Sequence, residues 1–159
     1  MRSITRIFLA NKIPDLQGAR CVSQSRFYLY RKNGVVIRVQ TKGDTFELER
    51  KVNKSAYIRE GEKISITRDE FDVFSKSASD HVIRDNYLIS KTPLVVLRIY
   101  HGRFEGLARV EIKFKSVDEA KSFVPLNWLG KEITLTPLAK DETLLGLTER
   151  EFQKLLSET

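Results

Sequence analysis

Two glutamates and a lysine alternate along one short segment of the chain. In residues 46–51, FELERK, the charged side chains of Glu47, Glu49 and Lys51 occupy every second position. Alternate residues of a β-strand project from the same face. Two carboxylates beside an ammonium group can begin a metal–phosphate site, because hard oxygen ligands bind Mg²⁺ and cations bind phosphate oxygens. The chemistry depends on the strand that carries this segment and on its neighbours.

The chain is strongly basic, which bears on its partners. It has 28 lysines and arginines against 21 aspartates and glutamates, a formal net charge of +7. Such an excess favours a polyanion as partner, and a solvated basic surface is the simpler alternative. The basic residues are spread along the chain, and it contains no Walker A loop, GxGxxG, HExxH or zinc-ligand spacing. Composition therefore indicates an anion without identifying it.

Length and composition favour one soluble domain over residues 1–159. Hydrophobic residues make up 41% of the 159 positions, enough to bury a core. No apolar run is long enough for a transmembrane helix, so no membrane association is expected. The segment MRSITRIFLANK carries an arginine within its apolar run and does not resemble a secretory signal. The single Cys21 cannot form an internal disulfide, which fits a cytoplasmic protein.

Alternating apolar and polar residues predict strands over most of the first two thirds of the chain. The segments KNG and KGD are typical hairpin turns and divide residues 26–52 into three strands. Further strands are predicted within 3–9, 57–66, 86–102 and 106–114. An antiparallel sheet is the simplest arrangement of strands joined in this way.

Three capping boxes predict helix starts between and after these strands. The segments TRDE (67–70), SVDE (116–119) and TERE (148–151) each place a hydroxyl residue three positions before a glutamate. Aromatic and aliphatic residues follow at helical spacing, as expected for helices that pack on a core. The predicted fold class is α+β, dominated by antiparallel strands.

Several motifs together resemble the CYTH family, also called the triphosphate tunnel metalloenzymes, which includes adenylate cyclase and thiamine triphosphatase relatives. The motifs are IxRxFLxxxxPDL at 4–16, then VVIRV, FELERK, ISITRDEF, RDNYLI and the late block YHGRFEGLARVEIKF…WLGKEIT. The resemblance covers nearly the whole chain. It implies an eight-stranded antiparallel β-barrel that forms a tunnel, with flanking helices. It also implies acidic residues that bind a divalent metal and basic residues that bind a triphosphate.

The family's acidic positions are largely replaced in this chain. Its opening ExExK signature aligns with Ser3, Thr5 and Ile7, so FELERK lies in a different strand. Carrying over the eight carboxylate positions of the family gives Ser3, Thr5, Gly61, Lys63, Val96, Arg98, Glu111 and Lys113. Only Glu111 keeps an acid, and three positions have become cationic. The family's metal set is therefore missing, and no metal is expected.

The family's basic positions are mostly retained. One arginine pair is represented by Arg38 and Gln40, and another basic pair by Arg84 and Asn86. With the acid-to-base replacements, seven cations are predicted to face the tunnel and bind phosphate: Arg38, Lys51, Arg59, Lys63, Arg84, Arg98 and Lys113. Retained cations and lost carboxylates point to anion binding without an obligatory metal.

We therefore interpret the chain as a divergent, CYTH-like pseudoenzyme that binds a small polyanion. Triphosphate, a nucleotide or polyphosphate would occupy the tunnel, with weak catalysis or none and no required cofactor. One alternative is a metal-dependent triphosphatase or adenylate cyclase-like enzyme in which Glu47, Glu49 and Glu111 hold Mg²⁺ or Mn²⁺. A barrel whose charges only balance one another is a second alternative.

Nucleic acid is the least favoured partner. Apart from the net charge, it would rest on cations expected at the surface: Arg26, Arg31, Lys32, Lys42 and Lys54. No base-reading motif accompanies them.

Overall fold

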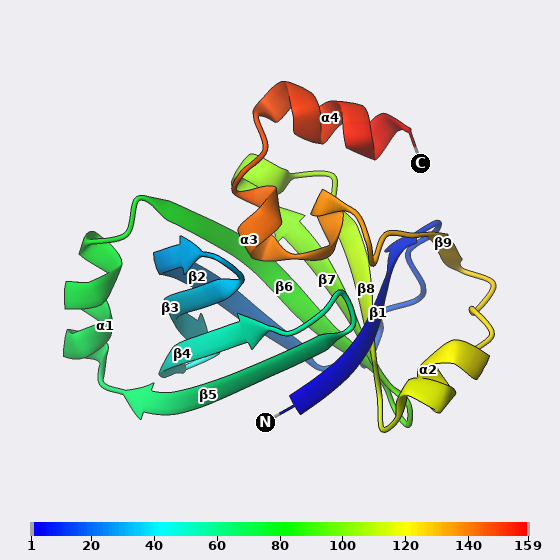
Figure 1. The fold of residues 1–159 in the computed structure, drawn as a ribbon, viewed down its shortest axis with the longest axis horizontal. Coiled ribbons are helices and arrows are strands. Elements are labelled where there is room, and N and C mark those ends of the chain that lie inside the picture. Colours follow the sequence, from blue (N-terminus) through cyan, green and yellow to red (C-terminus); the bar gives the residue numbers. More distant parts are fainter. Residues whose placement is uncertain (1, 159) are drawn as a thin grey trace.

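The main body of the molecule is a sheet of antiparallel strands, most of which pair with the next strand in the chain. The computed structural model describes residues 2–158 (Figure 1). Its long strands are β1 (Arg2–Ala10), β2 (Cys21–Lys32), β3 (Val35–Lys42), β4 (Thr45–Asn53), β5 (Ile58–Ile66), β6 (Asp80–Lys91), β7 (Leu94–His101) and β8 (Ala108–Phe114). Most agree in position with the predicted strands, but β2 and β6 begin earlier than predicted, and the segment predicted within 86–102 is divided between β6 and β7.

The sheet closes on itself through β1. The strand order is β5-β4-β3-β2-β6-β7-β8-β1, and β1 also pairs with β5. Its start lies beside β5, with Ile4 opposite Ile58, while its other end pairs with the short strand β9 (Leu129–Glu132). A closed sheet leaves few unpaired backbone groups. The predicted eight-stranded antiparallel barrel with flanking helices is confirmed.

The two predicted hairpin turns have the required backbone geometry. Between β2 and β3, Asn33 and Gly34 have φ angles of 52° and 74°, as expected for the Asn-Gly turn that matches strand twist. Gly43, between β3 and β4, has φ of 59°. The β3–β4 pairing is continuous, whereas the β2–β3 pairing shifts its register between Tyr28 and Tyr30.

Three helices begin where the capping boxes predict. They are α1 (Arg68–Lys76), α2 (Val117–Ser122) and α4 (Glu149–Ser157). In each, the preceding hydroxyl accepts a hydrogen bond from the backbone amide of the glutamate. The expected inward stripe of α1 is only half present, because Phe71 is buried and Phe74 is 36% exposed. None of the helices in residues 2–158 is long and apolar enough to cross a membrane.

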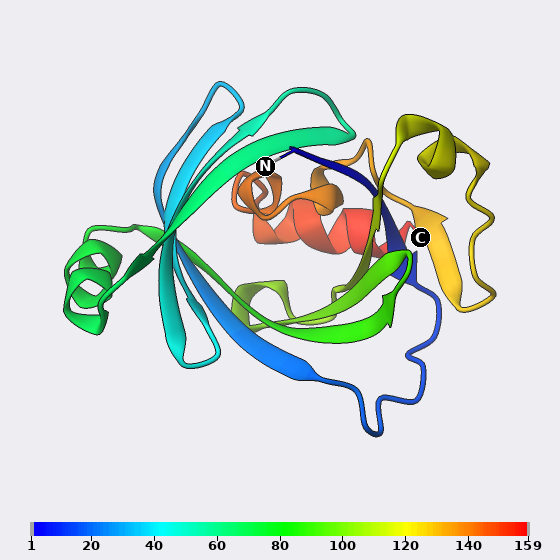
Figure 2. The same ribbon diagram turned by 90° about the horizontal axis from the view of Figure 1, so that it is seen from below.

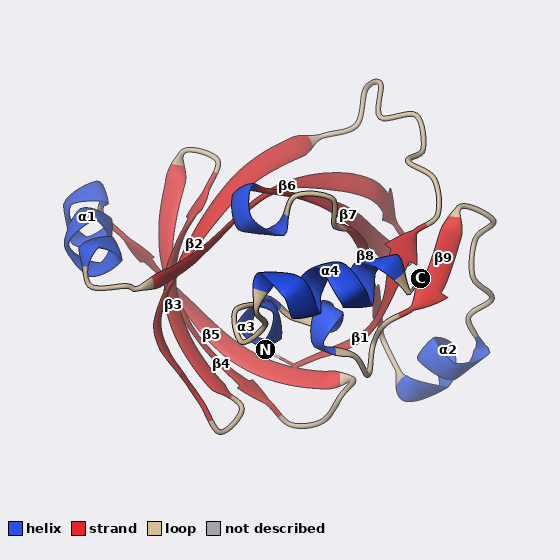
Figure 3. Ribbon diagram, turned by 90° about the horizontal axis from the view of Figure 1, so that it is seen from above, coloured by secondary structure: helices blue, strands red, loops and turns tan. Residues whose placement is uncertain are grey.

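The C-terminal segments cover one end of the barrel. The short elements η2 (Pro137–Ala139) and α3 (Asp141–Leu144) lie across this end, and α4 lies over them (Figures 1 and 3). We call residues 137–157 the C-terminal cap. The helical turn η1 (Gly102–Phe104) supports it, with the rings of Phe104 and Phe152 5.3 Å apart. Viewed from the opposite end, the strands surround the cap elements (Figure 2).

Two apolar clusters hold these parts together. One lies between the barrel end and the cap and includes Tyr28, Tyr100, Leu138, Leu144 and Phe152. The other packs the loop and helix around α2 against the outside of the barrel, and Trp128 is partly buried against it. Burial of this apolar surface fixes the cap on the barrel.

Candidate functional site

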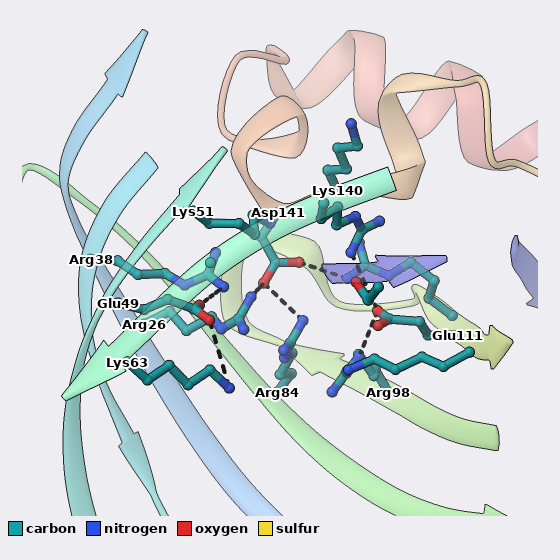
Figure 4. Close-up of a pocket in the computed structure, with 15 residues that line it drawn as sticks. Arg26, Arg38, Glu49, Lys51, Lys63, Arg84, Arg98, Glu111, Lys140 and Asp141 are labelled. Carbon is teal, nitrogen blue, oxygen red and sulfur yellow. Dashed lines mark hydrogen bonds and ion pairs between the residues drawn. The ribbon is translucent and has the colours of Figure 1, made fainter. Parts of the chain in front are cut away.

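Inward-facing side chains of the barrel form a basic cavity of about 390 Å³. Its lining contains Ser3, Arg26, Arg38, Glu49, Lys51, Arg59, Gly61, Lys63, Arg84, Arg98, Arg109, Glu111, Lys113, Lys140 and Asp141 (Figure 4). The strands contribute alternate residues, because every second side chain faces the interior. All seven cations predicted from the sequence line this cavity.

The interior changes from charged to apolar toward the cap. On β2, Arg26 lines the cavity and Tyr28, two residues further on, belongs to the apolar cluster. On β7, Arg98 and Tyr100 follow the same order. On the inner face of both strands, a cation of the cavity is thus followed, toward the cap, by a residue of the apolar cluster. The cavity is therefore bounded by an apolar layer at the capped end.

Asp141 of the cap enters the barrel and binds three arginines. Its carboxylate accepts hydrogen bonds from Arg26 and Arg84 at 2.9 Å, and from Arg109 at 3.0 Å. The Tyr100 hydroxyl donates another at 2.5 Å. The Asp141 side chain has no exposed surface. One carboxylate therefore joins β2, β6, β7 and β8 beneath the cap (Figure 4).

This arrangement keeps Asp141 ionised. Burial by itself raises the pKa of the carboxyl, but Arg84, Arg109 and Arg26 outweigh burial and hold the pKa well below its usual range. A buried carboxylate with several charge-assisted hydrogen bonds is a strong local anchor. Its negative charge also occupies the space that an outside anion would otherwise take beside these arginines.

Glu49 neutralises a second part of the cavity. Its carboxylate accepts a hydrogen bond from Arg38 and lies 3.6 Å from the Lys63 ammonium. Burial opposes ionisation, but the nearby arginines and lysines lower the pKa of Glu49 to about 2. Glu49 is therefore a counter-ion for the basic lining.

Glu111 is the third carboxylate of the cavity. Its Oε2 atom lies 3.4 Å from Arg98 Nε and 3.8 Å from Arg59 Nη1. Burial raises the pKa of Glu111, but Arg98, Arg59 and Lys113 together hold it well below its ordinary value. Both arginines therefore share one carboxylate at long distances.

The surroundings of three cavity lysines lower the pKa of their ammonium groups. Burial and then Arg38 lower the pKa of Lys51 well below its ordinary value, although Glu142 lies 3.4 Å away and opposes this. Burial and Arg59 lower the pKa of Lys140. For Lys113, Glu111 raises the pKa, but burial and neighbouring cations together lower it. These shifts indicate an excess of positive charge.

The lining contains too few carboxylates to balance its cations. Among the described residues that line the cavity, three carboxylates, Glu49, Glu111 and Asp141, face ten basic side chains: Arg26, Arg38, Lys51, Arg59, Lys63, Arg84, Arg98, Arg109, Lys113 and Lys140. A fourth carboxylate, Glu142, lies just outside the lining and pairs with Lys51. Several guanidinium nitrogens have no hydrogen-bond partner, including Nε and Nη2 of Arg59, a residue only 9% exposed. Buried donors without acceptors are costly, and an anion in the cavity would satisfy them.

The carboxylates do not fit the divalent metal that the family resemblance implies. Over residues 2–158, no group of three or more His, Cys, Asp and Glu side chains could hold a metal ion. Glu49 and Glu111 line the cavity, but Glu47 does not, and it accepts a hydrogen bond from Gln40 at 2.8 Å. The structure therefore does not bring Glu47, Glu49 and Glu111 together as a metal site.

Four lining residues escaped the sequence interpretation: Arg26, Arg109, Lys140 and Asp141. The expectation that Arg26 lies at the surface is wrong, since Arg26 is 9% exposed and paired with Asp141. Strand alternation could have identified Arg109, which shares the face of Glu111 and Lys113. No periodic pattern marks Lys140 and Asp141, which lie at the start of the short helix α3.

The chain forms a closed antiparallel barrel with a charged, predominantly basic interior, and the barrel is the fold that the CYTH-like resemblance implies. No family model matches the chain. It is 23% identical over 147 residues to a curated inorganic triphosphatase of Nitrosomonas europaea, covering 91% of this chain and 97% of the relative. The family resemblance is thereby confirmed.

Solved structures agree on the fold. A crystal structure of an inorganic triphosphatase superimposes with a TM-score of 0.70 at 24% identity, covering 92% of this chain and 95% of the other. A candidate adenylate cyclase from Bacillus halodurans gives a TM-score of 0.53 at 13% identity, over 79% and 93% of the two chains. At these sequence identities the solved structures establish that the barrel fold is shared. They do not establish the activity of this chain, which must be argued from the residues of the cavity.

Proposed function

We propose that this protein binds a triphosphate, nucleotide or polyphosphate-type anion in the basic cavity, without a required metal and with weak hydrolysis or none. The observation that carries the proposal is the excess of ten basic side chains over three carboxylates in the lining. The curated triphosphatase relative supports a phosphate-chain ligand. The cytoplasm, which the single cysteine favours, is the compartment we propose for it.

Metal-independent binding follows from the charges of the cavity. A divalent ion needs several oxygen ligands that converge on one point, and here each lining carboxylate is already engaged by cations. The excess cations can instead neutralise phosphate oxygens directly. Hydrolysis would lack a metal-activated water, so binding is the activity that the residues favour.

Isothermal titration calorimetry at low salt tests this function. Tripolyphosphate, ATP and medium-length polyphosphate are titrated in EDTA and, separately, in Mg²⁺ or Mn²⁺, and phosphate release is measured in parallel. We expect binding in EDTA, with at most slow release when metal is added. Binding or rapid hydrolysis that requires metal would instead support the triphosphatase or cyclase alternative, and absence of binding would support a purely structural barrel.

A nucleic-acid partner is tested in the same assay with single-stranded RNA. Of the surface cations considered for it, Arg31, Lys32, Lys42 and Lys54 are exposed. Binding to RNA would support the outer surface as the functional site if it depends steeply on salt and is unaffected by substitutions in the cavity.

A further inference from the structure

The C-terminal cap seals one end of the cavity. Leu138 and Leu144 of the cap are 2% and 0% exposed and pack with Tyr28 and Tyr100 of the barrel. This contact is apolar and closely packed, so a charged chain cannot pass between the cap and the strands. The entry consistent with this packing is the end of the barrel opposite the cap, which we call the mouth.

Asp141 removes the deepest arginines from the reach of a ligand. The side chains of Arg84 and Arg109 are 2% exposed, and that of Arg26 is 11% exposed. All three donate to the Asp141 carboxylate. A phosphate group that approached them would meet a fixed negative charge, because Asp141 stays ionised. The available cations lie between Asp141 and the mouth.

The free donors match the end of a phosphate chain. Arg59 offers two unpartnered nitrogens, Nε and Nη2, and Lys140 lies next to Asp141 in the chain. Nearer the solvent, the Lys63 side chain is 47% exposed. A terminal phosphate carries about −1.5 to −2 charges and three acceptor oxygens, more than an internal phosphate, which is linked by two phosphoanhydride bonds. The buried free donors thus suit a terminal phosphate group.

We propose that Asp141 is a specificity-determining residue that causes the cavity to recognise the free end of a phosphate chain. This inference rests on the proposed function. The chain enters from the open mouth, its terminal phosphate binds Arg59 and Lys140, and the Asp141 carboxylate stops it there. Internal phosphates then lie beside the more exposed Arg98, Lys63 and Lys113.

The first test compares two nucleotides of similar charge in the wild-type protein. ATP has one free phosphate end, whereas P1,P4-diadenosine tetraphosphate has none. We expect ATP to bind at least about tenfold more tightly. Long polyphosphate should bind no more than two protein molecules per chain, whatever its length. Equal affinity of the two nucleotides, or stoichiometry that grows with length, would overturn end recognition. If tripolyphosphate itself does not bind, the proposed function fails as well.

The second test replaces the Asp141 carboxylate. In Asp141→Asn, the ratio of tetrapolyphosphate affinity to tripolyphosphate affinity should rise severalfold, because the deep arginines become available to a longer chain. Asp141→Glu keeps the charge and should keep the wild-type ratio. A purely structural Asp141 would lower both affinities and leave the ratio unchanged, and this result would refute its role in specificity. Should Asp141→Asn not fold, the wild-type comparison above still decides between end recognition and its absence.

Discussion

Arg59 and Glu111 face each other across the cavity at 3.8 Å, measured between Arg59 Nη1 and Glu111 Oε2, and Arg59 keeps two unpartnered nitrogens. Glu111 lies closer to Arg98, at 3.4 Å. One carboxylate is thus shared by two guanidinium groups and fully pairs neither. Arg59 is therefore a buried cation with two nitrogens that donate to no protein group among residues 2–158.

Arg59→Gln should weaken anion binding and stabilise the free protein. The substitution removes the charge and the unpartnered donors, so tripolyphosphate binding should lose about 1.5–3 kcal/mol. The midpoint of thermal unfolding without ligand should rise, because a buried unsatisfied guanidinium is removed. Calorimetry and a thermal melt measure the two effects. Arg150→Gln, at an exposed position of α4, is the matched control and should change neither.

Asp141→Asn should destabilise the barrel. Three buried guanidinium groups lose their shared counter-ion, and removal of one partner from such a network typically costs about 3–5 kcal/mol. Tripolyphosphate should recover part of this loss, because it supplies negative charge to the folded state only. Urea unfolding with and without ligand measures both changes. An unchanged unfolding midpoint would contradict the anchoring role of Asp141, and Asp69→Asn on α1, at an exposed position, provides the control.

Anion binding should be accompanied by proton uptake at pH values below the ordinary lysine pKa of 10.5. The pKa values of Lys51, Lys113 and Lys140 are all lowered in the free protein, and a bound phosphate chain raises them again. Affinity should therefore fall as the pH rises from the lowered pKa values toward those of the complex. Titration in two buffers of different ionisation enthalpy gives the number of protons. Binding heats that are independent of the buffer would contradict this linkage.

Glu49 should make stability sensitive to acid. Its pKa is about 2 in the folded protein and 4.5 without the fold. Its contribution is fully present above pH 4.5 and is lost as the pH falls toward 2, since the unfolded state takes up the proton first. Unfolding midpoints measured across this range should fall less steeply in Glu49→Gln than in the wild type. Parallel curves for the two proteins would show that Glu49 does not contribute.

Local patterns predicted much of the barrel. The Asn33–Gly34 turn and the hydroxyl caps at Thr67 and Thr148 act over a few residues, so the sequence displays them directly. The seven predicted cations came from the positions that the family resemblance implies, and strand alternation then predicted that they share the inner face. The barrel closure itself came from the family resemblance, since the pairing of β1 with β5 has no local signal.

The cap and its carboxylate could not be predicted from the sequence. Asp141 follows a short helical turn and makes its contacts with residues 32, 57 and 115 positions away. Such contacts depend on the path by which the chain reaches the end of the barrel after β9, and no periodic pattern in the sequence indicates that path. The misplacement of Arg26 at the surface has the same cause, since its partner lies in the unpredicted cap.

Asp141 lies later in the chain than all three of its arginine partners, and this order has a consequence for biosynthesis. Arg26, Arg84 and Arg109 emerge from the ribosome before the residue that neutralises them. A barrel closed without the cap would bury three guanidinium groups together with no counter-ion, which is unfavourable. We therefore expect stable closure of the barrel only after residues 137–157 have been added.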